Sequence, residues 1–240
     1  MDRTRDDGRC GGDCTALALV GEPQMTSHLD DATLTSTGLD ATGNGRVLLI
    51  ACGAIAREVL AVIEANDWTH LDVRCLPAIL HNSPEKITDA VRQAVAEKSG
   101  SYDKTYILYA DCGTGGQLQA ACAELGVEML AGPHCYSFFE GNEAFARHAE
   151  DEFTAFYLTD FLVRQFEAFV IKPLGLDRHP DLRDMYFGNY EKLIYQAQTN
   201  DPALDEKARS CADRLGLAYE RRQTGYGDLE GDLRDWINPA

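Results

Sequence analysis

Three cysteines follow three separate apolar runs of the chain, each at a position where a strand is expected to end. Cys52 lies in VLLIACGAIAREVL, Cys112 in TYILYADCGTGGQL, and Cys135 in VEMLAGPHCYSFFEG. In an open parallel α/β sheet the carboxyl ends of the strands share one edge, and ligands bind in the crevice at that edge. If the three runs are neighbouring parallel strands, three thiols converge there, which is the outline of a metal or sulfur-chemistry site.

Thiolate is a soft ligand for zinc and for iron–sulfur clusters. We expect a zinc ion first and an iron–sulfur cluster second. The three cysteines have no zinc-finger spacing, whereas three ligands from strand ends with an open fourth position are typical of a catalytic zinc centre. His134, next to Cys135, and His81, after the second apolar run, are the candidates for a fourth ligand or for a partner of a ligand.

A structural role is the alternative for each thiol taken alone, because free cysteine is among the most buried residue types and often only packs. We assign that packing role to Cys75, Cys122 and Cys211. Cys10 and Cys14 form a CGGDC pattern near the amino terminus, but no second pair completes a metal site there.

The DCGTGGQL loop precedes an expected helix, so its backbone amides could hold an anionic group of a cofactor or substrate. The glycines concerned are Gly113, Gly115 and Gly116. The loop lacks the lysine of a P-loop and the spacing of a dinucleotide fingerprint. Alternatively, the glycines only make a tight turn from strand to helix.

The candidate catalytic residues are Cys112, Asp111 and Glu58. Either carboxylate could orient a ligand or act as a general base, although a solvated surface carboxylate is the ordinary alternative in so acidic a chain. Cys112, near a helix N-terminus, could also serve without metal as a nucleophile with a lowered pKa.

The elements that must position these residues alternate between strand and helix. Short apolar runs predict strands at 47–51, 71–76, 105–110 and 127–131, and amphipathic segments between them predict helices at 54–65, from Ser83 onward, and at 118–125. The order β-α-β-α-β-α-β predicts a three-layer, Rossmann-like parallel sheet of about four to five strands.

The second half of the chain, from about residue 136, is expected to be rich in helix. Aromatic residues recur from 149 to 171 at helical spacing and predict one long helix, which belongs to the core or to a homodimer interface. Further helices are expected at 181–186, 190–196 and 203–215, with a late strand at 217–221. The predicted organisation is a disordered leader over 1–44, a single domain over 45–235, and a tail over 236–240.

The composition narrows the function classes. The net charge of −17, with 39 acidic and 22 basic residues, disfavours binding to nucleic acid or to an anionic membrane surface. No apolar run is long enough to span a bilayer, and no signal peptide is evident. Eight cysteines without a secretory signal predict a reducing compartment, and therefore a cytoplasmic protein.

The chain resembles a family of uncharacterised proteins, domain of unknown function 1638, over about residues 46–235. The resemblance rests on ACG, LH, DCG and HC in that order, and on the late segment GLAYERRQTGYGDLE. It implies an association with corrinoid-dependent methylamine and betaine methyltransferases, and so with one-carbon metabolism, in which zinc-bound thiolates serve many methyl transfers. No corrinoid-binding histidine motif is present.

Three hypotheses follow from the residues and the resemblance. The first is a metal enzyme of methyl-group metabolism that acts on a small molecule. The second is a non-catalytic accessory or ligand-binding protein of a methyltransferase system. The third is a metal-free enzyme with a cysteine nucleophile.

Overall fold

The computed structural model describes residues 29–149 and 151–237, and these form two parallel sheets covered by helices. The first sheet has the order β2-β1-β3-β4, and its strands are Val47–Cys52 (β1), Leu71–Leu76 (β2), Lys104–Leu108 (β3) and Glu128–Met129 (β4). The predicted parallel α/β class and all four predicted strands are confirmed.

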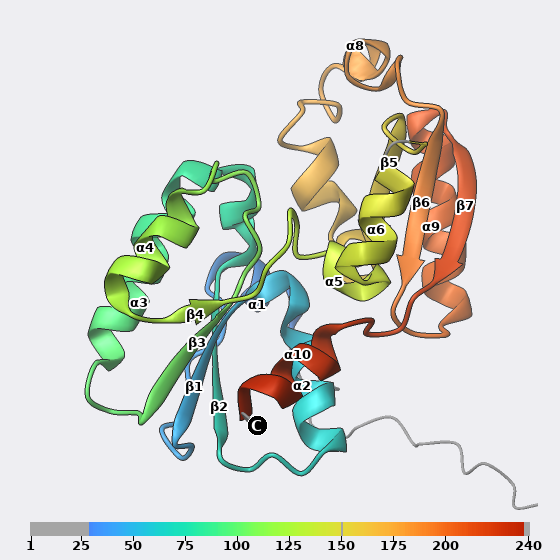
Figure 1. Cartoon of the computed structure of the whole chain (residues 1–240). Coiled ribbons are helices and arrows are strands. Elements are labelled where there is room, and N and C mark those ends of the chain that lie inside the picture. Colours follow the sequence, from blue (N-terminus) through green and yellow to red (C-terminus); the bar gives the residue numbers. More distant parts are fainter. Residues whose placement is uncertain (1–28, 150, 238–240) are drawn as a thin grey trace, which may run out of the picture.

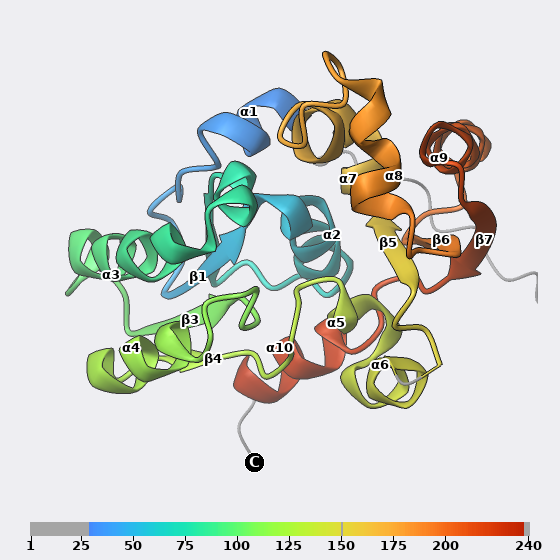
Figure 2. The same ribbon diagram turned by 90° about the horizontal axis from the view of Figure 1, so that it is seen from above.

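Helices cover both faces of the first sheet (Figures 1 and 2). The α2 (Ala56–Ala65) and α10 (Leu229–Ile237) helices lie on one face, and α3 (Ile87–Lys98) and α4 (Gln117–Leu125) lie on the other. Because both faces are covered, β1 is an unbroken apolar run, and Leu48, Leu49 and Ile50 have no exposed surface. The α10 helix returns from the end of the chain, and Trp236 stacks on Tyr106 of β3 at 4.7 Å between ring centroids.

The second sheet has the order β5-β6-β7, with strands Ala155–Thr159, Lys192–Ala197 and Ala218–Gln223. The α9 helix (Pro202–Leu215) packs against it. The other helices of this half are α5 (Ser137–Glu140), α6 (Asn142–Ala149), α7 (Asp160–Arg164), the π-helix η5 (Glu167–Ile171) and α8 (Arg183–Phe187). Short 3-10 turns are η2 (Gly53–Ile55), η3 (Ala78–Asn82), η4 (Pro84–Lys86) and η6 (Pro180–Leu182).

Two predicted helices are wrong. The segment 149–171 is divided: β5 ends at Thr159, whose hydroxyl accepts a hydrogen bond from the Leu162 amide and so caps α7. The segment 190–196 is mainly β6, the central strand of the second sheet. Because β6 is buried on both faces, its sequence lacks the alternation of apolar and polar residues that identifies a strand. Such a short apolar run cannot be told from a buried helix by its pattern. The helix at 203–215, the helix at 181–186 and the late strand agree with the structure.

The expected leader and tail are partly folded. Residues Asp31–Ser36 form α1, with Asp30 as its N-cap and Leu34 buried, and Leu39 forms an isolated bridge with Cys75. The α10 helix covers the first two positions of the expected tail. Cys10 and Cys14 lie outside the described residues. Within the described part of the chain, no helix is long and apolar enough to cross a membrane.

Candidate functional site

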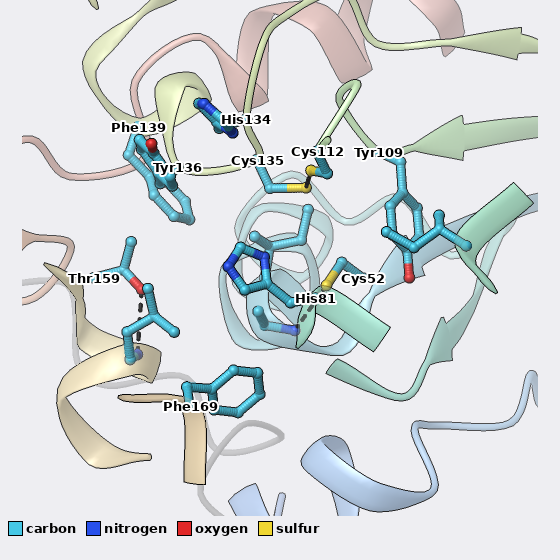
Figure 3. A pocket seen from close by; sticks show the side chains of 14 residues that line it. Cys52, His81, Tyr109, Cys112, His134, Cys135, Tyr136, Phe139, Thr159 and Phe169 are labelled. Atoms are coloured by element: carbon cyan, nitrogen blue, oxygen red, sulfur yellow. Dashed lines mark hydrogen bonds between the residues drawn. The ribbon is translucent and has the colours of Figure 1, made fainter. Parts of the chain in front are cut away.

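The three predicted thiols come together at the carboxyl edge of the first sheet (Figure 3). Cys52 is the last residue of β1, Cys112 follows β3, and Cys135 follows β4. The sulfur atoms of Cys112 and Cys135 are 3.2 Å apart, and Cys135 also shares a hydrogen bond with Cys52. Parallel pairing of adjacent strands explains the convergence, because β1 pairs with β3 and β3 pairs with β4.

The loops that carry Cys112 and Cys135 are tied to each other by backbone hydrogen bonds. The Cys112 amide donates to the Pro133 carbonyl at 2.9 Å, and the Asp111 amide donates to the Gly132 carbonyl at 3.0 Å. Cys112 has a φ of +48°, a left-handed conformation that is uncommon for residues other than glycine and often occurs at functional sites. The two thiols are therefore held in place by the backbone.

Asp111 braces the glycine loop and does not line the thiol cavity. Its carboxylate accepts hydrogen bonds from the amide of Gly116 at 2.6 Å, from the amide of Gly115 at 3.2 Å and from the hydroxyl of Thr114 at 2.9 Å. These bonds, that of Gly116 first, lower the pKa of Asp111. Because two of the amides predicted to hold an anion already bind Asp111, the geometry favours the alternative of a tight turn, which Gly113 also enters with a φ of +84°.

Cys135 lies between the other two thiols and holds its proton more tightly than Cys52 does. Hydrogen bonds to the sulfurs of Cys112 and Cys52, together with burial, raise the pKa of Cys135 well above its ordinary value. The hydrogen bond from Cys135 lowers the pKa of Cys52, and the Ala54 amide donates to the Cys52 sulfur at 3.5 Å. Of the two thiols, Cys52 is therefore the one that gives up its proton more easily.

His81 and His134 line the same cavity as the three thiols. Burial of the rings lowers the pKa of both imidazoles. His134 stacks on Tyr136 with 4.8 Å between ring centroids. Neutral imidazole is the form that coordinates a metal, so both histidines suit the predicted role.

The cavity between these side chains has a volume of about 40 Å³. Its remaining lining is largely apolar and comes from both halves of the chain, including Ile55 and Ile87 from the first half and Leu162 and Phe169 from the second. The buried hydroxyl of Tyr109 lies beside Cys52 and helps to lower the pKa of that thiol, and burial raises the pKa of Tyr109 itself well above the ordinary value. The site is thus a small, thiol-lined cavity at the junction of the two sheets.

The third predicted catalytic residue, Glu58, lies elsewhere. It is 4% exposed on α2, does not line the cavity, and has its pKa raised to about 7 by burial. Cys75, Cys122 and Cys211 are buried away from the cavity, and burial raises the pKa of each thiol. Their positions fit the predicted packing role.

Sequence patterns did not indicate the aromatic part of the site. Tyr109, Tyr136 and Phe169 line the cavity, but each resembles an ordinary core residue in sequence. The predicted long helix over 149–171 includes Thr159 and Leu162, although Thr159 ends β5 and Leu162 belongs to α7. The strand-to-helix junction at Thr159, marked by Thr-Asp before an apolar run, is the signal that could have placed them at a strand end.

The described residues contain no group of three or more His, Cys, Asp and Glu side chains arranged to hold a metal ion. Two sulfurs bound to one tetrahedral zinc at about 2.3 Å lie about 3.8 Å apart. The 3.2 Å separation of Cys112 and Cys135 is shorter, so the sulfurs would have to move apart to share an ion.

The fold and the site define a parallel α/β protein with a cluster of thiols at the strand ends. The chain belongs to the family described as a protein of unknown function, DUF1638, whose model matches residues 75–232. This match confirms the resemblance; it includes Cys112, Cys135 and both cavity histidines, and begins after Cys52. No curated protein and no solved structure matches the chain.

Proposed function

We propose that Cys52, Cys112 and Cys135 form a thiolate centre that binds a soft metal ion, with zinc first and an iron–sulfur cluster second. The observation that carries this proposal is the position of Cys135 between two other thiols from different strand ends, with its sulfur 3.2 Å from that of Cys112 and a hydrogen bond shared with Cys52. Packing alone explains the burial of a single thiol. A cluster of three thiols places three polar groups where apolar side chains would pack equally well, so packing does not explain the cluster.

The chemistry of the surroundings supports the same proposal. His81 and His134 supply neutral nitrogen donors at the cavity, and the rest of its lining is largely apolar. A rotation of the Cys112 or Cys135 side chain would widen the sulfur–sulfur distance to that needed for tetrahedral zinc. Three thiolates and one open position would leave the ion free to act as a Lewis acid on a bound thiol or water.

In this proposal the protein acts in a reducing compartment, the cytoplasm, where thiols stay free. Its role would lie in methyl-group metabolism on a small molecule, beside corrinoid-dependent methyltransferases, as the family resemblance implies. It could act there as an enzyme or as an accessory protein. A homodimer also stays a prediction, although Phe161, Phe166 and Phe169 of the aromatic segment are buried in the core, and Phe153 is 81% exposed.

A metal-free cysteine enzyme is the second candidate. The left-handed backbone at Cys112 and its contact with the Cys135 sulfur favour this function, because strained residues in contact with a second thiol are found in thiol-based active sites. In that case one cysteine alone should carry the chemistry.

Metal analysis distinguishes the two candidates. The full-length protein, purified anaerobically without a metal-affinity tag, is analysed by plasma mass spectrometry beside Cys52→Ser, Cys112→Ser and Cys135→Ser. We expect about one zinc, or several irons, per chain in the wild type and a loss in all three variants, with no loss in the buried control Cys122→Ser. Absence of metal from the wild type, together with one cysteine that reacts rapidly with iodoacetamide, would refute the metal centre and favour the nucleophile.

A further inference from the structure

A groove of about 590 Å³ opens directly onto the thiol cavity. Its walls come from the β5 strand, from the segment 162–174 that contains η5, and from Tyr190. The groove and the cavity share five lining residues, which are His81, His134, Tyr136, Leu162 and Phe169. The volume is in the range of sites that bind small molecules, so a ligand in the groove has access to the thiols past the two histidines.

None of the residues that line this groove is Asp, Glu, Lys or Arg, although these make up 25% of the chain. A carboxylate, phosphate or ammonium group of a ligand would therefore find no opposite charge in the walls. Transfer of an unpaired charge from water into such surroundings is costly. The groove selects against charged ligands.

Aromatic rings form much of the wall. Tyr136 stacks on Tyr157 with 5.6 Å between centroids, and Phe156 meets Tyr190 edge to face at 6.0 Å. The π-helix η5 contributes Phe169 and Val170, and π-helical turns often occur at functional sites. Flat apolar walls of this kind fit a ligand with an aromatic or aliphatic body.

The inner cavity, about 40 Å³ in volume, admits only a small group at the end of such a ligand. A thiolate-bound soft ion prefers sulfur as its further ligand. We propose that this groove binds an uncharged organic thiol, with its body between the aromatic walls and its sulfur at the Cys52–Cys112–Cys135 cluster. This assignment rests on the metal centre proposed above for the choice of sulfur, but the preference for an uncharged body follows from the groove alone.

The test uses the full-length protein loaded with Co²⁺, whose absorption spectrum reports sulfur ligands. The probes are benzyl mercaptan and 4-(mercaptomethyl)benzoate, which differ by one carboxylate, and benzyl alcohol, which lacks sulfur. We expect benzyl mercaptan to change the cobalt spectrum, the carboxylate probe to bind about tenfold or more weakly by calorimetry, and benzyl alcohol to leave the spectrum unchanged.

Leu174→Glu places a charge in the groove and should weaken benzyl mercaptan binding about tenfold or more while the cobalt content stays the same. Leu182→Glu, at a half-buried position outside the groove, is the matched control and should bind as the wild type does. Equal affinity for both mercaptans, or no effect of Leu174→Glu, would overturn the inference even if cobalt binds. A protein that binds no cobalt but still discriminates between the mercaptans would refute the metal centre and support the uncharged groove.

Discussion

Glu58 should make the stability of this protein fall as the pH rises from about 4.5 to 7. The carboxyl group is 4% exposed, and burial raises its pKa from 4.5 to about 7. In that pH window the folded chain keeps a proton that the unfolded chain releases, so the stabilisation is complete below pH 4.5 and is lost as the pH passes the folded pKa. A difference of about 2.5 units corresponds to roughly 3 kcal/mol.

Glu58→Gln keeps the shape of the protonated carboxyl and removes its titration. Urea unfolding is measured at half-unit steps from pH 4.5 to 8.5 for the wild type and the variant. We expect the free energy of unfolding of the variant, relative to that of the wild type, to rise by about 3 kcal/mol across the window. Glu85→Gln, at an exposed position, is the control and should follow the wild type. A difference between the wild type and Glu58→Gln that stays constant with pH would refute this account of the buried carboxyl.

Three further predictions concern the glycine loop, the Cys112–Cys135 pair and the turn before α10. Asp111→Asn removes the charge from the hydrogen bonds to the glycine loop and should lower the free energy of unfolding by about 1–2 kcal/mol in urea titrations. Because the loop then holds Cys112 less firmly, Ellman's reagent should react with Cys112 faster than in the wild type. Oxidation of the metal-free protein with diamide should join Cys112 to Cys135, because their sulfurs need to close only from 3.2 Å to about 2.05 Å; peptide mass spectrometry that found another pairing would contradict the geometry. Gly227→Ala should lower the free energy of unfolding by about 3 kcal/mol in chemical denaturation, because its φ of +53° disfavours a side chain and the added Cβ would meet the Phe138 and Phe139 carbonyls. Gly225→Ala, whose added Cβ would lie in open space, is the control and should lower it by only about 1 kcal/mol.

The first sheet could be predicted from the sequence because its signals are local. Each strand is a short apolar run followed by a turn and an amphipathic helix, and short crossovers permit only parallel pairing. The late strand of the second sheet was predictable too, but its β5 and β6 strands escaped prediction for a physical reason. In β6, Leu193, Ile194 and Tyr195 are all fully buried, so no alternation separates the strand from a buried helix. In the segment 149–171, aromatic residues at helical spacing belong partly to β5 and partly to α7 and η5.

The thiols of the site could also be predicted, since their convergence depends only on strand ends that share one edge. The groove could not, because its walls depend on how the second sheet packs against the first. Asp111 shows a further limit of sequence analysis. Its carboxylate could equally have served a ligand, and only the structure reveals that it accepts hydrogen bonds from the amides of Gly115 and Gly116.

The two sheets contribute different parts of the proposed site. All three thiols and both histidines lie at or just after the ends of strands of the first sheet, whereas β5 and the segment 162–174 form most of the groove wall. Cys112 and Cys135 lie on loops that are tied to each other by backbone hydrogen bonds, and Cys52 belongs to β1, so changes in the groove wall need not move the thiols. Metal affinity and ligand preference should therefore respond to different substitutions, with metal content sensitive to Cys52, Cys112 and Cys135, and discrimination between ligands sensitive to the wall around Leu174.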